Sequence, residues 1–246
     1  MNALEKNAFT QTLNKLGKSL PRPQAILSIS AHWETLGTQV LYKAQPTTIH
    51  DFYGFPEALQ KMEYPAAGSL TVAREVKKLI PGAEFNETWG LDHGSWSVLV
   101  HLYPHADVPV LQLSLDTKAT PQRHYEIGQM LRPLREQGVL ILGTGNISHN
   151  LRKLSRDGSG DFAWATTFDE GIRQALLTRD NDKVISYEEH FPQEAPLAVP
   201  SPEHYYPLLY ALGASTAEDK VSFPYEGFEM GSLDMRCVMF TSPSCS

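Results

Sequence analysis

Apolar positions along the chain alternate between helical spacing and short runs that are typical of buried strands. Phe9, Leu13 and Leu16 recur at helical spacing, and Gly17 follows them as a stop signal. The same pattern predicts further helices over residues 70–80, 95–103, 121–136 (interrupted by Pro133), 164–176 and 202–212. It predicts strands over residues 24–31, 38–42, 83–86, 108–115, 139–142, 221–225 and 236–240. Such alternation indicates one α/β domain over residues 1–246, with a central mixed, mostly parallel sheet flanked by helices.

Composition and charge then narrow the class of protein. The chain has 246 residues, 41% of them hydrophobic, and 21 basic against 28 acidic residues give a net charge of −7. This balance argues against a nucleic-acid partner, which needs a basic surface. Only Cys237 and Cys245 are present, which excludes a disulfide scaffold, and neither a membrane span nor a signal peptide is visible. We expect a soluble, cytoplasmic protein without a membrane partner.

Histidines are the candidate functional residues. Four of the nine lie in polar motifs at predicted element ends: His32, His93, His149 and His204. Glycines at 143 and 145 are expected to let the backbone turn sharply before His149. A single histidine is more often structural than a ligand, but ligands collect beyond the carboxyl ends of strands in α/β sheets. Because histidine is the commonest metal ligand, the four together favour a metal site.

Other enzyme classes have weaker support in the sequence. The chain contains no GxSxG nucleophile elbow and no Walker loop, and the glycine pair at 143 and 145 lacks the third glycine of a dinucleotide fingerprint. Neither cysteine has a neighbouring histidine, which argues against a thiol nucleophile. No HExxH motif forces the histidines into one site either.

With these motifs the chain resembles the class III extradiol ring-cleavage dioxygenases, of the 4,5-DOPA dioxygenase type. The resemblance runs nearly end to end. It rests on the segments at residues 21–26, 30–33, 48–56, 64–66, 92–96, 145–151, 202–205 and 229–232. A dispersed set of motifs in one order implies an extradiol-dioxygenase-like catalytic domain over residues 1–246.

The resemblance implies that O₂ opens a catechol ring such as that of L-DOPA by 4,5-cleavage, at a mononuclear non-haem metal site. The partners are therefore a catechol-type small molecule and O₂. Turnover would require Fe(II) with open coordination positions. A histidine-rich set without a carboxylate also suits Zn(II), which the purified protein is expected to carry and which cannot perform the redox step.

By position, the resemblance implies His32, His149 and His204 as metal ligands. It implies His93 and His149 as acid/base residues, with Asp92 as the natural orienting partner of His93. It also suggests three substrate-pocket residues, His50, His124 and Trp33. For the two histidines a structural use is equally open.

Two departures from the family keep alternatives open. Many relatives have a glutamate where this chain has His204. The family's first strand ends in a metal-binding His-Gly-Ser-Pro, immediately before a Met-Asn-x-Leu-Glu stretch that here begins at Met1. We therefore expect that strand and ligand to be missing. The alternatives are a zinc-dependent hydrolase on the same histidines and a catalytically impaired metal-binding protein.

Overall fold

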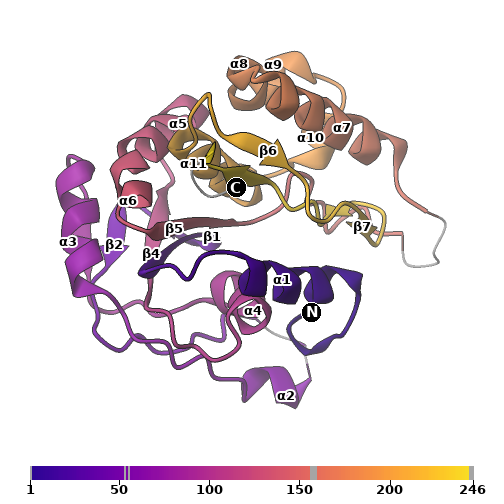
Figure 1. Ribbon diagram of the computed structural model, residues 1–246. Helices are drawn as coiled ribbons and strands as arrows, with labels where there is room; N and C mark the ends of the chain where they lie inside the picture. The colour runs from indigo at the N-terminus through magenta and orange to yellow at the C-terminus, as the bar shows by residue number, and fades with distance from the viewer. Residues whose placement is uncertain (1, 53, 55, 156–159, 244–246) are drawn as a thin grey trace. The chain divides into compact units, whose positions relative to one another are not determined.

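The computed structural model describes residues 2–52, 54, 56–155 and 160–243 (Figure 1). The chain divides into two compact units. The first contains Met1–Ala119 and Met130–Thr144, and the second contains Thr120–Gln129 and Gly145–Ser246. Among the described residues, no helix combines the length and apolar character that a membrane crossing needs. Cys237 is a free thiol, and Cys245 lies outside the described residues.

The first unit is built on a mixed sheet. Across the described residues its five strands follow the order β3-β2-β4-β1-β5. β1 runs parallel to β4 and β5, β2 runs parallel to β3, and only the β2–β4 pair is antiparallel within this sheet. The strands are β1 (Ala25–Thr35), β2 (Gln39–Leu41), β3 (Glu84–Asn86), β4 (Val110–Asp116) and β5 (Val139–Thr144). This confirms the predicted α/β class with a mostly parallel mixed sheet.

Helices of the first unit cover this sheet. α4 packs against β1 and α1, which Figure 1 shows beside one another, while α3 packs on β2 and α6 on β5. Their apolar faces meet the strands in a core that includes Ile26, Leu41, Trp96 and Leu99. The helices are η1 (Asn2–Leu4), α1 (Ala8–Ser19), α2 (Glu57–Gln60), α3 (Leu70–Leu79), α4 (His93–Leu102) and α6 (Arg132–Glu136).

The second unit is mainly helical and has its own core around Phe168, Tyr187 and Tyr205. The predicted helix over 121–136 is two helices, because α5 ends at Met130 and Pro133 lies in the first turn of α6. The elements of this unit are α5 (Pro121–Met130), α7 (Ala163–Thr178), α8 (Asn181–Ile185), α9 (Tyr187–His190), α10 (Ala195–Ala198), η2 (Pro202–His204), α11 (Tyr206–Ala214), β6 (Lys220–Ser222), β7 (Phe228–Glu229), β8 (Leu233–Asp234) and β9 (Met239–Thr241). β6 and β9 pair antiparallel, and so do β7 and β8.

The carboxyl end of β1 is irregular. Pairing with β4 is regular up to Ile29↔Leu113 and resumes only at Glu34↔Leu115, so four residues of β1 face one residue of β4. Pairing with β5 stops at Ser30↔Thr144. The strand therefore continues to Thr35, beyond the predicted end at residue 31, and His32 lies in the segment that leaves the regular ladder. Bulged segments of this kind turn side chains in new directions.

A buried carboxylate joins α4 to the sheet. Asp92 is 0% exposed and is the N-cap of α4, since its Oδ1 accepts the Ser95 N–H at 3.0 Å. The same oxygen accepts the Ser30 hydroxyl of β1 at 2.7 Å. Its Oδ2 accepts Gln112 Nε2 of β4 at 2.7 Å, and the Asp92 N–H donates to Gln112 Oε1 at 2.9 Å. One side chain thus binds two strands and a helix terminus.

We expect Asp92→Ala to lower the free energy of unfolding by about 2–4 kcal/mol, because it removes a cap and leaves buried donors unpaired. The matched control is Ser69→Ala, which removes the N-cap of α3 alone and should cost about 1 kcal/mol. Urea unfolding of both variants measures the difference. Equal losses in the two variants would show that Asp92 acts only as a cap.

Candidate functional site

The first unit gathers two histidines and a carboxylate, which we call the His32–Asp51–His93 cluster. Asp51 Oδ1 lies 2.9 Å from His93 Nδ1, and Asp51 Oδ2 lies 3.8 Å from His32 Nδ1. The two imidazole rings have their centroids 3.9 Å apart. One ligand atom from each residue lies within 4.8 Å of the others, a spacing that would accommodate a metal ion. All three side chains are partly buried.

Neighbouring elements place these three residues. His93 is the first residue of α4, directly after the Asp92 cap, and His32 lies in the irregular segment of β1. Gly94 allows the helix to approach the strand, since a Cβ there would lie 2.8 Å from His32 Cδ2. Asp51 follows the bridge between Thr48 and Leu91. Tyr53 and Phe55 of the same sequence motif lie outside the described residues.

The carboxylate beside His93 is Asp51, whereas the sequence predicted Asp92. Asp92 uses its oxygens on Ser30, Ser95 and Gln112, so adjacency in sequence gives no contact with the imidazole. Asp51 Oδ1 also accepts the His93 backbone N–H at 3.0 Å. Burial by itself would raise the pKa of Asp51, but the ring and backbone N–H of His93 outweigh it and lower that pKa below its usual range. Asp51 is therefore ionised at neutral pH.

The second unit brings His149 and His204 together. Their rings stack with centroids 3.5 Å apart and an interplanar angle of 6°. His204 Nδ1 lies 3.1 Å from Asn146 Oδ1. His204 ends η2, two residues before α11 begins at Tyr206, so the predicted helix over 202–212 starts as a 3₁₀ turn. The two stacked imidazoles offer nitrogen donors of the type that Fe(II) and Zn(II) bind.

The glycines before His149 have a different use from the one predicted. Neither has a positive φ among the described residues, so no sharp left-handed turn occurs there. Gly143 lies inside β5 and pairs with Ile29. Gly145 is needed for close approach, since a Cβ would lie 2.1 Å from the carbonyl oxygen of His204.

The predicted substrate-pocket residues lie in three different settings. His50 Nε2 is 2.9 Å from the Met62 carbonyl oxygen, and its ring lies against Trp96. Trp33 is 2% exposed and stacks on Trp89, which favours a packing role. His124 is fully buried in the second unit, where its Nδ1 lies 2.9 Å from the Tyr210 hydroxyl. Contact of these three residues with a substrate stays a prediction.

The structure therefore brings His32 together with His93, and His149 together with His204. The joint role of His32, His149 and His204 as ligands of one metal stays a prediction. Sequence reasoning missed Asp51 and Asn146. Both lie inside motifs that carried the family resemblance, at residues 48–56 and 145–151, and that is the signal which could have singled them out.

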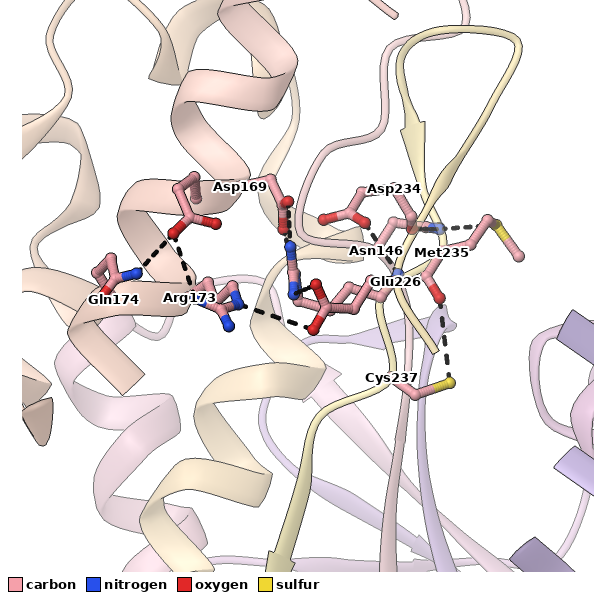
Figure 2. A network of polar contacts seen from close by, with 10 residues as sticks. Asn146, Asp169, Arg173, Gln174, Glu226, Asp234, Met235 and Cys237 are labelled. Atoms are coloured by element: carbon pink, nitrogen blue, oxygen red, sulfur yellow. Dashed lines mark hydrogen bonds and ion pairs between the residues drawn. The ribbon is translucent and has the colours of Figure 1, made fainter. Parts of the chain in front are cut away.

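Asn146, which contacts His204, also contacts a network of charged side chains around Asp234 (Figure 2). Arg236 makes two 2.5 Å contacts with the Asp169 carboxylate and a 2.9 Å contact with Glu226. Asp234 is 2% exposed, and its backbone carbonyl accepts Asn146 Nδ2 at 2.6 Å. Burial and the nearby Asp169 charge raise the pKa of Asp234 well above its usual range. The raised pKa favours the protonated form of Asp234 beside the Asp169–Arg236 ion pair.

Comparison with known proteins gives consistent results along the whole chain. The family described as the catalytic LigB subunit of aromatic ring-opening dioxygenase matches residues 4–233. A 4,5-DOPA dioxygenase extradiol of Escherichia coli (strain K12) is 44% identical over 245 residues, which are 97% of this chain and 90% of that protein. A protein of the same name from Beta vulgaris is 38% identical over 226 residues, covering 90% and 84% of the two chains.

A solved structure shares the fold. The crystal structure of the uncharacterized protein JW3007 from Escherichia coli K12 matches with a TM-score of 0.83 and 40% identity. The match covers 96% of this chain and 93% of that chain.

The raised pKa of Asp234 makes a signed prediction about stability. In the unfolded chain Asp234 ionises near pH 3.9, while in the folded protein it stays protonated to higher pH, so its contribution to stability falls as pH rises through this window. Asp234→Asn lacks this loss. We therefore expect the free energy of unfolding of the variant, relative to that of the wild type, to rise by up to about 1.4 kcal/mol per pH unit within the window.

Urea unfolding at pH 4 and at pH 7 measures this gain. Asp169→Asn is the opposing control, because it removes the carboxylate that makes two contacts with the buried Arg236 and leaves only Glu226 beside it. This loss should cost about 3–5 kcal/mol. A stability difference between Asp234→Asn and wild type that stays constant with pH would contradict the assigned proton.

Proposed function

Because this chain belongs to the family of the catalytic LigB subunit of aromatic ring-opening dioxygenases, we propose that it opens the ring of a catechol such as L-DOPA by extradiol 4,5-cleavage. The class of reaction follows from the family. The substrate is suggested by relatives named 4,5-DOPA dioxygenase extradiol in Escherichia coli and Beta vulgaris. The single observation that carries the proposal within the structure is the His32–Asp51–His93 cluster.

The donor chemistry of the described residues fits a divalent metal. In this proposal His32, His149 and His204 hold the ion. Asp51 adds a carboxylate 3.8 Å from His32 Nδ1, so an oxygen donor is available despite the histidine at position 204. Imidazole and carboxylate suit both Fe(II) and Zn(II). The Fe(II) ion, when bound, supplies the open coordination positions and the redox capacity that O₂ chemistry requires. We expect the purified protein to carry Zn(II) instead.

The Asp51–His93 pair supplies the proton transfers. Ionised Asp51 can only accept hydrogen bonds, so in this proposal Nδ1 of His93, which lies 2.9 Å from Asp51 Oδ1, carries the proton. This leaves Nε2 of His93 free to take a proton from a catechol hydroxyl and to return it later in the reaction. The Asp51 charge also stabilises the imidazolium that forms in between. His149 serves as the second acid/base residue in this proposal.

Apolar surroundings favour an aromatic substrate. Phe52 lies edge-on to His93, with ring centroids 5.4 Å apart. The ring centroid of Trp96 lies 6.0 Å from that of Phe52. Apolar rings around a few polar groups are typical of sites that bind flat organic molecules. They also limit water around the proton-transfer pair, which strengthens its electrostatic interactions.

The reaction itself is tested with the metal-free protein loaded anaerobically. We expect Fe(II)-loaded protein to consume O₂ in step with loss of L-DOPA, followed with an oxygen electrode and by absorbance. Zn(II)-loaded protein should not, because zinc has no redox chemistry. Absence of O₂ uptake with L-DOPA and with simple catechols would refute the proposal, and anaerobic hydrolysis by the zinc form would favour a hydrolase.

The proton-transfer pair makes a separate prediction. We expect His93→Gln to lower kcat by about 10²- to 10⁴-fold through loss of the acid/base group, with Asp51→Asn giving a smaller loss. Metal content is measured for each variant to separate proton transfer from metal loss.

The matched control is Asp182→Asn, which removes the carboxylate 3.1 Å from His190 on the surface of the second unit and should leave kcat unchanged. Wild-type kcat in His93→Gln would exclude the assigned role.

A further inference from the structure

We infer that Asn146 is a positioning residue that fixes the ring orientation and the protonated nitrogen of His204, so that His204 presents Nε2 to a divalent metal. The inference rests on the proposed function in one respect, namely that His204 is a ligand. The contacts that carry it lie within the second unit. Figure 2 shows those that Asn146 makes with Asp234 and Met235.

The orientation of the Asn146 amide is determined by its neighbours. Its Nδ2 donates to the Asp234 backbone carbonyl at 2.6 Å and lies 3.8 Å from Met235 Sδ. A reversed amide would place two oxygen atoms 2.6 Å apart, without a hydrogen between them. Oδ1 must therefore be the atom that lies 3.1 Å from His204 Nδ1.

This orientation selects the tautomer of His204. A carbonyl oxygen only accepts hydrogen bonds, so the imidazole nitrogen opposite Asn146 Oδ1 must donate. The proton of neutral His204 is consequently on Nδ1, and the lone pair is on Nε2. Metal-binding histidines characteristically use their second nitrogen in this way, and the partner of that nitrogen orients the ring.

Asn146 also fixes the backbone of His204. The Asn146 N–H donates to the His204 carbonyl oxygen at 2.9 Å. Gly145 packs against the same oxygen so closely that a Cβ would lie 2.1 Å from it. The Asn146 residue thus contacts the main chain and the side chain of His204 together, which restricts both the position and the rotation of the ring.

The acceptor that orients Asn146 is itself fixed. The Asp234 N–H donates to the Ser148 carbonyl at 2.9 Å, and Asp234 Oδ1 accepts the Arg236 N–H at 2.9 Å. Asp234 belongs to β8, which pairs with β7. The loop that contains Asn146 and the strand that contains Asp234 therefore hold each other through two backbone carbonyls.

The first test uses the metal-free wild-type protein and needs no activity. Long-range ¹H–¹⁵N NMR spectra, recorded well above the ordinary imidazole pKa of about 6.5, report which nitrogen of His204 carries the proton. We expect Nδ1–H in wild type and a mixed or Nε2–H tautomer in Asn146→Leu. A wild-type His204 protonated on Nε2 would overturn the inference.

The second test measures Zn²⁺ affinity by competition with a chromophoric chelator. We expect Asn146→Leu to weaken binding by about 10- to 100-fold, as for other partners of metal-bound histidines. Asn146→Asp retains an acceptor for His204 Nδ1 but sets its second oxygen against the Asp234 carbonyl, so it should bind Zn²⁺ more tightly than Asn146→Leu and less tightly than wild type.

Asn150→Leu is the matched control. It also removes a buried amide from this loop, one that donates to the Leu197 carbonyl and accepts from the Arg152 N–H instead of contacting an imidazole. Equal losses of affinity in Asn146→Leu and Asn150→Leu would overturn the inference. Failure of O₂ uptake with an intact tautomer and affinity pattern would refute the proposed reaction and leave the positioning role standing.

Discussion

The hydrogen bonds of the buried Asp92 carboxylate are the constraint on which the first unit depends. Asp92 joins the N-terminus of α4 to β1 and β4, and α4 begins with His93. The same serine that binds Asp92 lies two residues before His32 on β1. Asp92 therefore holds the two elements that carry His32 and His93 next to each other in the core.

The histidines differ in the chemical group that lies next to one of their ring nitrogens. A carboxylate oxygen lies 2.9 Å from His93 Nδ1, whereas the oxygen of a neutral amide lies 3.1 Å from His204 Nδ1. His50 and His124 face a backbone carbonyl and a tyrosine hydroxyl, and each contacts aromatic rings. The same residue type thus serves distinct purposes according to its partner.

Much of the fold could be predicted from the sequence, because its long elements have clear periodicity. The pattern located α1, α3, α4 and α7 and every strand of the central sheet. Helices α8 to α10 were missed because segments of four or five residues are too short to show a helical period. The irregular end of β1 was missed because register is decided by the partner strands, which one segment does not encode. Asp51 lies on a loop, where no hydrophobic period and no strand end shows which way a side chain points, so its contact with His93 is visible only in three dimensions.

The irregular end of β1 has a consequence for how this protein can change. Four residues there occupy the space of one on β4, so a sheet with continuous pairing would gain ladder hydrogen bonds and stability. Continuous pairing would return His32 to the regular alternation of side chains along β1. It would also separate His32 from Asp51 and His93. Stability and the geometry of the His32–Asp51–His93 cluster are therefore in direct opposition at this segment, and stabilising substitutions would have to lie elsewhere.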